Sequence, residues 1–187
     1  MGRAALPTAH SGEAGALSAR GIPVAALTAY RTAEATLAET TPSCRLSWTL
    51  LAGIGRVESG HGRYGGASIG SDGVVRPAII GIRLDGSAPG TAVVLDTDRG
   101  RSDGDPGYDR AVGPMQFLPA TWAAYRVSAT SGHAPDPHNI NDAALTAGSY
   151  LCASGLDLAD AADRRAAVLR YNHSEAYADT VLSLAAA

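Results

Sequence analysis

Lysine is missing from this sequence, because all 15 of its basic residues are arginine. The arginines form no basic block and stand against 18 acidic residues, which gives a formal net charge of -3. Proteins that bind the phosphate backbone of nucleic acids carry a basic patch or stripe. We therefore expect no nucleic-acid partner.

Long apolar runs are also missing, and no window approaches the length of a membrane span. Aromatic residues make up 5% of the chain, with Phe117 as the only phenylalanine. Hydrophobic residues at 45% and charged residues at 18% are the balance of a soluble globular protein, which argues against a membrane bundle or a disordered tail. A chain of 187 residues predicts one domain, which we expect to be a monomer.

Cysteine occurs only twice, as Cys44 and Cys152, which is too few for a disulfide scaffold and lacks the spacing of a zinc site. The two residues are either a disulfide pair or two buried thiols. A disulfide would indicate an oxidising, extracytoplasmic compartment. The opening residues MGRAALPTAH lack the apolar core of a secretory signal. We therefore expect a mature or shortened chain that begins behind a new Met, and export is inferred rather than displayed.

Apolar spacing predicts a mainly helical domain over residues 21–187, preceded by a flexible segment at 1–20 that is poor in large apolar groups. A first helix is expected over about 22–39, with Pro23 in its first turn. A second helix follows Pro42 and ends at Gly60 and Gly62. Three features locate further helices: Pro119 near a first turn, Asn139 or Asn141 as an N-cap, and helical patterns over about 159–171 and 174–184.

A glycine-rich stretch at about 65–110 interrupts the helical pattern. The runs Pro77–Leu84 and Thr91–Asp96 are rich in residues that favour strands, and they flank the turn DGSAPG. They predict a β-hairpin flap. The expected fold class is therefore mainly α, with a small β-hairpin insertion.

Glu58 is the strongest candidate for catalysis. Its spacing from Leu51 and Ile54 places a carboxyl group on the apolar side of the second helix, in its last turn. Burial and the negative end of the helix dipole both raise a carboxyl pKa toward the range of a general acid. The alternative is a solvated glutamate at an exposed helix end.

Three motifs resemble the lytic transglycosylases in order and spacing, over about 22–184: GIGRVESGHG, AVGPMQFLPATW and RYNHSEAY. The likeness is to the membrane-bound lytic murein transglycosylase B branch and its secreted actinobacterial-type relatives, and it implies a lysozyme-like domain. It also implies that Glu58 is the catalytic acid/base and that Gln116, Tyr171 and Asn172 contact the sugar.

The chemistry that this resemblance implies is non-hydrolytic cleavage of the bond from N-acetylmuramic acid to N-acetylglucosamine in peptidoglycan, giving 1,6-anhydromuramyl products. The internal 6-hydroxyl nucleophile explains why no second catalytic carboxylate is evident. The expected partner is the glycan strand, no cofactor is implied, and the location is secreted or in the cell envelope.

Other roles stay open for the site residues. Ser59 either orients Glu58 and helps to bind substrate, or is a plain helix-end hydroxyl. Gln116 either binds sugar or bonds to neighbouring backbone. Asn172 and Glu175 also fit a helix capping box. Aromatic residues offer stacking faces for sugars, although Trp122 and Tyr125 are better explained as core, and the group comprises Tyr64, Tyr108, Trp122, Tyr125 and Tyr177.

An acidic loop, DTDRGRSDGD, is a weak candidate for calcium, with Asp96, Asp98, Asp103 and Asp105 as the possible ligands. The EF-hand pattern is not met, because Gly107 stands where that pattern has a glutamate. A turn held by hydrogen bonds to the aspartates is the favoured interpretation.

Two rival functions remain. In a hydrolase of the goose-type lysozyme kind, an aspartate such as Asp72 or Asp109 would position water. In a non-catalytic module, the same fold would bind peptidoglycan without turnover.

Overall fold

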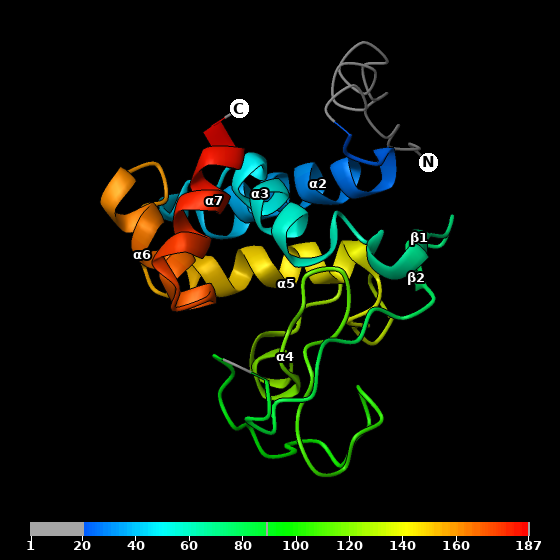
Figure 1. Ribbon diagram of the computed structural model, residues 1–187. Coiled ribbons are helices and arrows are strands. Elements are labelled where there is room, and N and C mark those ends of the chain that lie inside the picture. The colour runs from blue at the N-terminus through cyan, green and yellow to red at the C-terminus, as the bar shows by residue number, and fades with distance from the viewer. Residues whose placement is uncertain (1–20, 89, 187) are drawn as a thin grey trace, which may run out of the picture.

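The computed structural model describes residues 21–88 and 90–186, and within them the fold is mainly helical (Figure 1). The expected fold class is confirmed, with six α-helices and one two-stranded antiparallel sheet in those ranges. The flexible segment expected at 1–20 lies outside the described residues. The helices are α2 (Val24–Thr40), α3 (Trp48–Ser59), α4 (Pro119–Tyr125), α5 (Ile140–Cys152), α6 (Ala161–Tyr171) and α7 (Glu175–Ala186).

The core lies between two helix pairs, α2 with α5 and α3 with α7. Glycines allow both close approaches. A Cβ atom on Gly53 of α3 would lie 2.7 Å from the Val181 carbonyl oxygen of α7, and one on Gly148 of α5 would lie 2.4 Å from a Leu37 methyl carbon of α2. Because these two residues have no side chain, the backbone of one helix contacts the side chains of the other. This packing fixes the position of the last turn of α3.

The predicted signals mark several of the helix ends, and Ser47 adds a cap that was not predicted. The Ser47 hydroxyl accepts from the Thr49 N–H and caps α3, which ends at Gly60 in the left-handed conformation, with φ of 59°. Of the two asparagines considered for the start of α5, it is Asn139 that accepts from the Asn141 N–H. Pro119 stands in the first turn of α4. Local chemistry thus sets where the helices begin and end.

The regular two-stranded sheet lies before the predicted hairpin in the sequence, and the predicted hairpin is formed only next to its turn. The sheet consists of β1 (Ser68–Ile69) and β2 (Val75–Arg76), with Ser68 opposite Arg76. The two predicted strands, Pro77–Leu84 and Thr91–Asp96, pair only next to their turn: the Val94 N–H donates to the Leu84 carbonyl at 2.8 Å, and an isolated bridge joins Asp85, the first residue of the turn, to Val93.

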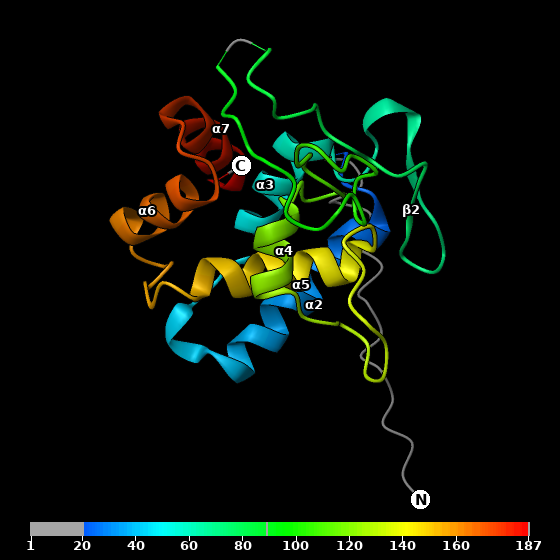
Figure 2. The same cartoon turned by 90° about the horizontal axis from the view of Figure 1, so that it is seen from below.

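The first of these segments pairs mainly elsewhere. The Gly81 N–H donates to the Ala111 carbonyl and the Leu84 N–H to the Asp109 carbonyl, at 2.7 and 3.2 Å. The strand-forming residues at 77–84 therefore pair with a segment that is distant in the sequence, and no local sequence pattern identifies that segment. Figures 1 and 2 show this connection, drawn in green, outside the helical body.

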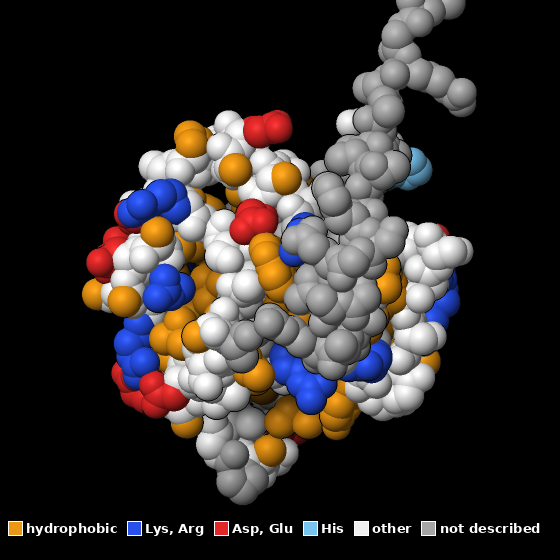
Figure 3. All heavy atoms as spheres, turned by 90° about the horizontal axis from the view of Figure 1, so that it is seen from above, with side chains coloured by type: hydrophobic (Ala, Val, Ile, Leu, Met, Phe, Trp, Pro, Cys, Tyr) orange, Lys and Arg blue, Asp and Glu red, His pale blue; other side chains and the backbone are white. Residues whose placement is uncertain are grey.

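The surface has mixed charge. On the face seen in Figure 3, basic and acidic side chains alternate along one edge, among scattered hydrophobic groups. Among the ion pairs of the described residues, Arg165 pairs with Glu175 and with Asp179. No helix in the described ranges combines the length and the apolarity that a membrane crossing requires.

The two cysteines form a disulfide, which settles the open alternative. Cys44 lies in a short 3-10 turn over Pro42–Cys44 that follows α2, and Cys152 is the last residue of α5. The two residues have a sequence separation of 108 and a distance of 5.4 Å between their Cα atoms. The Leu158 N–H also donates to the Cys44 carbonyl. The bridge therefore fastens the start of the helical body to the segment that leads into α6.

Replacing both Cys44 and Cys152 by serine is expected to lower the free energy of unfolding, because a long loop in the unfolded chain is no longer closed. The chain-entropy model sets the loss at about 4 to 5 kcal/mol as an upper figure. Urea unfolding of both proteins measures it, with the reduced wild-type protein as control. An unchanged midpoint would contradict a structural role for the bridge.

Candidate active site

Glu58 lies in the last turn of α3 and lines a groove of about 370 Å³. The other lining residues come from three further segments: the 3-10 turn after α3 (Tyr64–Gly66), the extended stretch at 79–82, and the loop before α4. They are Tyr64, Ile79, Ile80, Gly81, Ile82, Arg110 and Gln116. The groove thus contains one acidic side chain, surrounded by apolar, phenol, amide and guanidinium groups.

Burial raises the pKa of Glu58 to about 7, against an opposing effect of the hydrogen bond from Tyr177, which lowers it. The Tyr177 hydroxyl, on α7, donates to Oε1 of Glu58 at 2.5 Å. Oε2 has no hydrogen-bond partner among the described residues. A carboxyl group in this state carries a proton for much of the time at neutral pH and can offer it from Oε2.

A buried tyrosine supports α3 from behind. Tyr30 of α2 is fully buried, and its hydroxyl lies 3.2 Å from Nδ1 of His61, which is itself buried. A Cβ atom on Gly55 would lie 2.0 Å from that hydroxyl, so the absence of a side chain at Gly55 allows Tyr30 to pack directly against α3. Burial and the nearby Arg56 and Arg63 lower the pKa of His61 to about 4, which leaves it neutral at physiological pH.

Two hydroxyl groups hold the loop that carries Gln116. Ser59 donates to the Pro114 carbonyl at 2.6 Å, and Tyr171 donates to the Met115 carbonyl at 2.7 Å. Gln116 itself takes a left-handed backbone conformation, with φ of 49°, and its Nε2 donates to the Gly113 carbonyl at 2.8 Å. These bonds place the Gln116 side chain in the same groove as Glu58.

Of the four residues expected to bind substrate, only Gln116 is among the described residues that line the groove with Glu58, and Tyr64, one of the possible stacking aromatics, lines it as well. Ser59 is buried, and its hydroxyl also accepts from the Gly62 N–H, so it positions backbone and is not turned to a substrate. Tyr171 packs its ring on Phe117 and Tyr150 and likewise positions the loop. Both hydroxyls thus support the loop in this structure, and direct substrate binding by Ser59 and Tyr171 stays a prediction.

Asn172 is exposed and lies just past the end of α6, where it does not line the groove. It does not cap the next helix either. The hydroxyl of Ser174 accepts from the Tyr177 N–H at 3.3 Å and caps α7, while Glu175 pairs with Arg165. The capping box considered for Asn172 and Glu175 is therefore not formed.

Tyr177 is the residue that sequence reasoning undervalued. It was grouped with possible stacking aromatics, whereas its hydroxyl is the direct partner of Glu58. The signal was present, because Tyr177 ends the third motif, RYNHSEAY. Nothing in the motif indicates that α7 packs on α3 and brings a residue 119 positions away to the acid.

The acidic loop matches the turn interpretation. The carboxylates of Asp96 and Asp98 accept from main-chain N–H groups within 96–102, and those of Asp103 and Asp105 accept from N–H groups within 105–110. Within the described ranges, no group of three or more His, Cys, Asp or Glu side chains is placed to hold a metal ion. The four aspartates organise their own loop.

The two aspartates considered for water activation are also engaged elsewhere. Asp109 is fully buried and accepts from the N–H and the hydroxyl of Thr97, at 2.9 and 2.7 Å. Asp72 pairs with Arg76 at 2.8 Å at the exposed β1–β2 turn. Neither lines the Glu58 groove.

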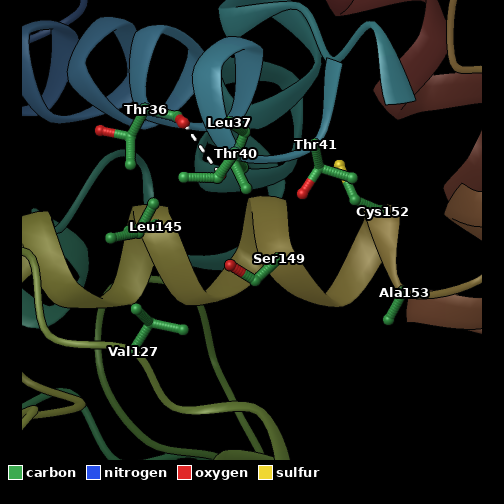
Figure 4. A pocket seen from close by; sticks show the side chains of 9 residues that line it. All are labelled: Thr36, Leu37, Thr40, Thr41, Val127, Leu145, Ser149, Cys152 and Ala153. Atoms are coloured by element: carbon green, nitrogen blue, oxygen red, sulfur yellow. Dashed lines mark hydrogen bonds between the residues drawn. The ribbon is translucent and has the colours of Figure 1, made fainter. Parts of the chain in front are cut away.

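Two other hollows in the described part of the chain lack an acidic side chain. One of about 360 Å³ lies between α2 and α5 and is lined by hydroxyl and apolar groups (Figure 4). Another, of about 650 Å³ beside α3, α6 and α7, has three arginines as its ionisable groups. Neither contains a group that gives and takes a proton near neutral pH, so the Glu58 groove is the candidate active site.

No protein-family model, no curated protein and no solved structure matches this chain.

Replacing Tyr177 by phenylalanine is expected to raise the pKa of Glu58 above about 7, because the hydroxyl stabilises the charged carboxylate that burial disfavours. A carbon-13 NMR titration of the Glu58 carboxyl measures this. Tyr125→Phe is the matched control, since that hydroxyl contacts Arg170 instead. A pKa that stays unchanged in the Tyr177 variant would contradict the assignment.

Replacing Glu58 by glutamine is expected to change the free energy of unfolding, relative to wild type, more favourably at pH 8 than at pH 5. The folded state holds the proton up to about pH 7 and the unfolded state only to about 4.5, so wild-type stability falls as pH rises between these values and is level above them. For a half-buried group we expect about 2 kcal/mol, measured by urea unfolding of both proteins at both pH values. A difference independent of pH would show that Glu58 titrates normally.

Proposed function

We propose that the protein is a lytic transglycosylase that cleaves the bond from N-acetylmuramic acid to N-acetylglucosamine in peptidoglycan and leaves 1,6-anhydromuramyl ends. The observation that carries the proposal is a single, half-buried carboxyl group with a pKa near 7 in a groove of about 370 Å³, on the helix where the first motif lies. Gln116, in the second motif, lines the same groove, and Tyr177, in the third, donates to the acid. The three motifs thus converge on one site.

The chemistry needs one residue in two roles. Glu58 protonates the glycosidic oxygen as the bond from C1 of the muramyl ring breaks. The 6-hydroxyl of the same ring then forms a bond to C1 and gives its proton to the Glu58 carboxylate, which restores the acid. Between these two steps, the oxygen of the substrate's N-acetyl group stabilises the positive charge at C1. The Gln116 amide is a candidate hydrogen-bond donor to that N-acetyl group.

Transglycosylation is favoured over hydrolysis by the positions of the aspartates. An inverting glycosidase needs a second carboxylate about 6.5 to 9.5 Å from the acid to activate water, and a retaining one needs a nucleophile at about 5 to 5.5 Å. Glu58 is the one carboxyl group among the described residues that line the groove. An internal nucleophile removes the need for another.

The place of action follows from the substrate and the disulfide. Peptidoglycan lies outside the cytoplasmic membrane, and disulfides persist in oxidising compartments such as the extracellular space. The Cys44–Cys152 bridge is consistent with that environment. We propose a secreted or cell-envelope location, with the glycan strand as the partner.

Glu58→Gln is expected to reduce release of soluble muropeptides by about 10²- to 10⁴-fold, the usual contribution of a general acid. Mass spectrometry of digests of purified sacculi provides the measurement, and wild type should yield anhydromuramyl ends. Asp109→Asn and Asp72→Asn are the comparison variants. Reducing muramic ends, lost in an aspartate variant, would establish hydrolysis. No products from wild type, with equal binding of chitooligosaccharide by wild type and Glu58→Gln, would establish a non-catalytic module.

A further inference from the structure

One wall of the Glu58 groove is main chain. Four consecutive residues, Ile79 to Ile82, line it. Their segment is extended, since Ile80 bridges Val112 and the Gly113 N–H donates to the Ile79 carbonyl at 2.8 Å. In an extended chain successive side chains point to opposite faces, so a groove lined by four residues in a row meets the edge of the backbone.

This edge is unpaired. The Gly81 N–H and the Ile79 carbonyl turn toward 111–113, so the N–H and carbonyl of Ile80 point to the other side of the segment. Neither Ile80 nor Ile82 has an acceptor for its N–H in the part of the chain that the structure describes. An open edge of this kind is a template for an added extended chain.

The positive charge of Arg110, beside this backbone edge, indicates that the added chain carries a negative charge. With Glu58 protonated, Arg110 is the one formally charged group among the described lining residues. Its Nε and Nη2 lie 3.4 Å from Asp105, which has a closer partner in Arg83 at 3.0 Å. Nη1 of Arg110 has no hydrogen-bond partner in the described ranges, which leaves it available to a carboxylate.

We propose that the edge at Ile80 and Ile82 binds the peptide stem of peptidoglycan as an added strand, with Arg110 pairing with a stem carboxylate. This rests on the proposed function, because it requires a glycan with peptide branches. The Ile80 and Ile82 N–H groups, both without an acceptor among the described residues, are two residues apart, and two residues of extended chain span about 7 Å, the repeat of an extended peptide. The enzyme would therefore prefer strands that still carry their stems.

The first test uses a free stem tetrapeptide with an N-terminal lactyl group, titrated into nitrogen-15-labelled wild-type protein. The amide protons of Ile80 and Ile82 should shift to lower field, while that of Gly81, already bonded to Ala111 at 2.7 Å, stays in place. Arg110→Gln should raise the Kd at least fivefold. The exposed Arg101 of the acidic loop supplies the control, Arg101→Gln, which should leave the Kd within twofold. Equal shifts at all three amides, or none at millimolar peptide, would overturn the proposal.

The second test compares kcat/KM on glycan strands with stems and on strands from which an amidase has removed them. The ratio should exceed ten for wild type and for Arg101→Gln, and should fall toward one for Arg110→Gln. Cleavage with a ratio near one for wild type would overturn stem recognition and leave the proposed function intact. Peptide binding at Ile80 and Ile82 without cleavage of either substrate would sustain the binding edge and overturn the proposed function.

Discussion

Two hydrogen bonds to successive carbonyl groups hold the candidate site together. The Ser59 hydroxyl, at the end of α3, donates to the Pro114 carbonyl, and the Tyr171 hydroxyl, at the end of α6, donates to the Met115 carbonyl. The next residue, Gln116, has a left-handed backbone, a conformation that costs a residue other than glycine roughly 1 to 2 kcal/mol. Because both carbonyls before it are fixed by buried or half-buried hydroxyls, the loop keeps this conformation and Gln116 stays in the groove of Glu58.

The acid itself is set by two opposing effects. Burial disfavours the charged carboxylate, and the Tyr177 hydroxyl favours it; burial is the larger, which leaves the pKa of Glu58 near 7. Burial and the charge of Glu58 also raise the pKa of Tyr177 well above its ordinary value, so its hydroxyl remains a donor. A proton on Glu58 is thus held tightly enough to be present at neutral pH and loosely enough to be given up.

Sequence reasoning succeeded where the determining interactions are local. Apolar spacing and cap residues such as Gly60 and Asn139 act within a few positions, so the helices and their ends follow from them. The strand at 77–84 was misassigned because its partner, at 109–113, is set by tertiary pairing. The hydrogen bonds of Ser59, Tyr171 and Tyr177 could not be predicted for the same reason, since each joins residues 55 to 119 positions apart.

The carboxyl groups of this protein are divided by their surroundings into two kinds. Those of the exposed turns, such as Asp72 and Asp105, accept N–H groups from backbone and arginine, which lowers their pKa and keeps them charged. Glu58 has one hydroxyl partner and a groove wall of apolar side chains, and its pKa is raised. Groups with such different surroundings have different uses: the ionised Asp105 shapes the loop that carries Arg110, whereas a carboxyl that stays protonated at neutral pH is suited to giving a proton to a leaving oxygen.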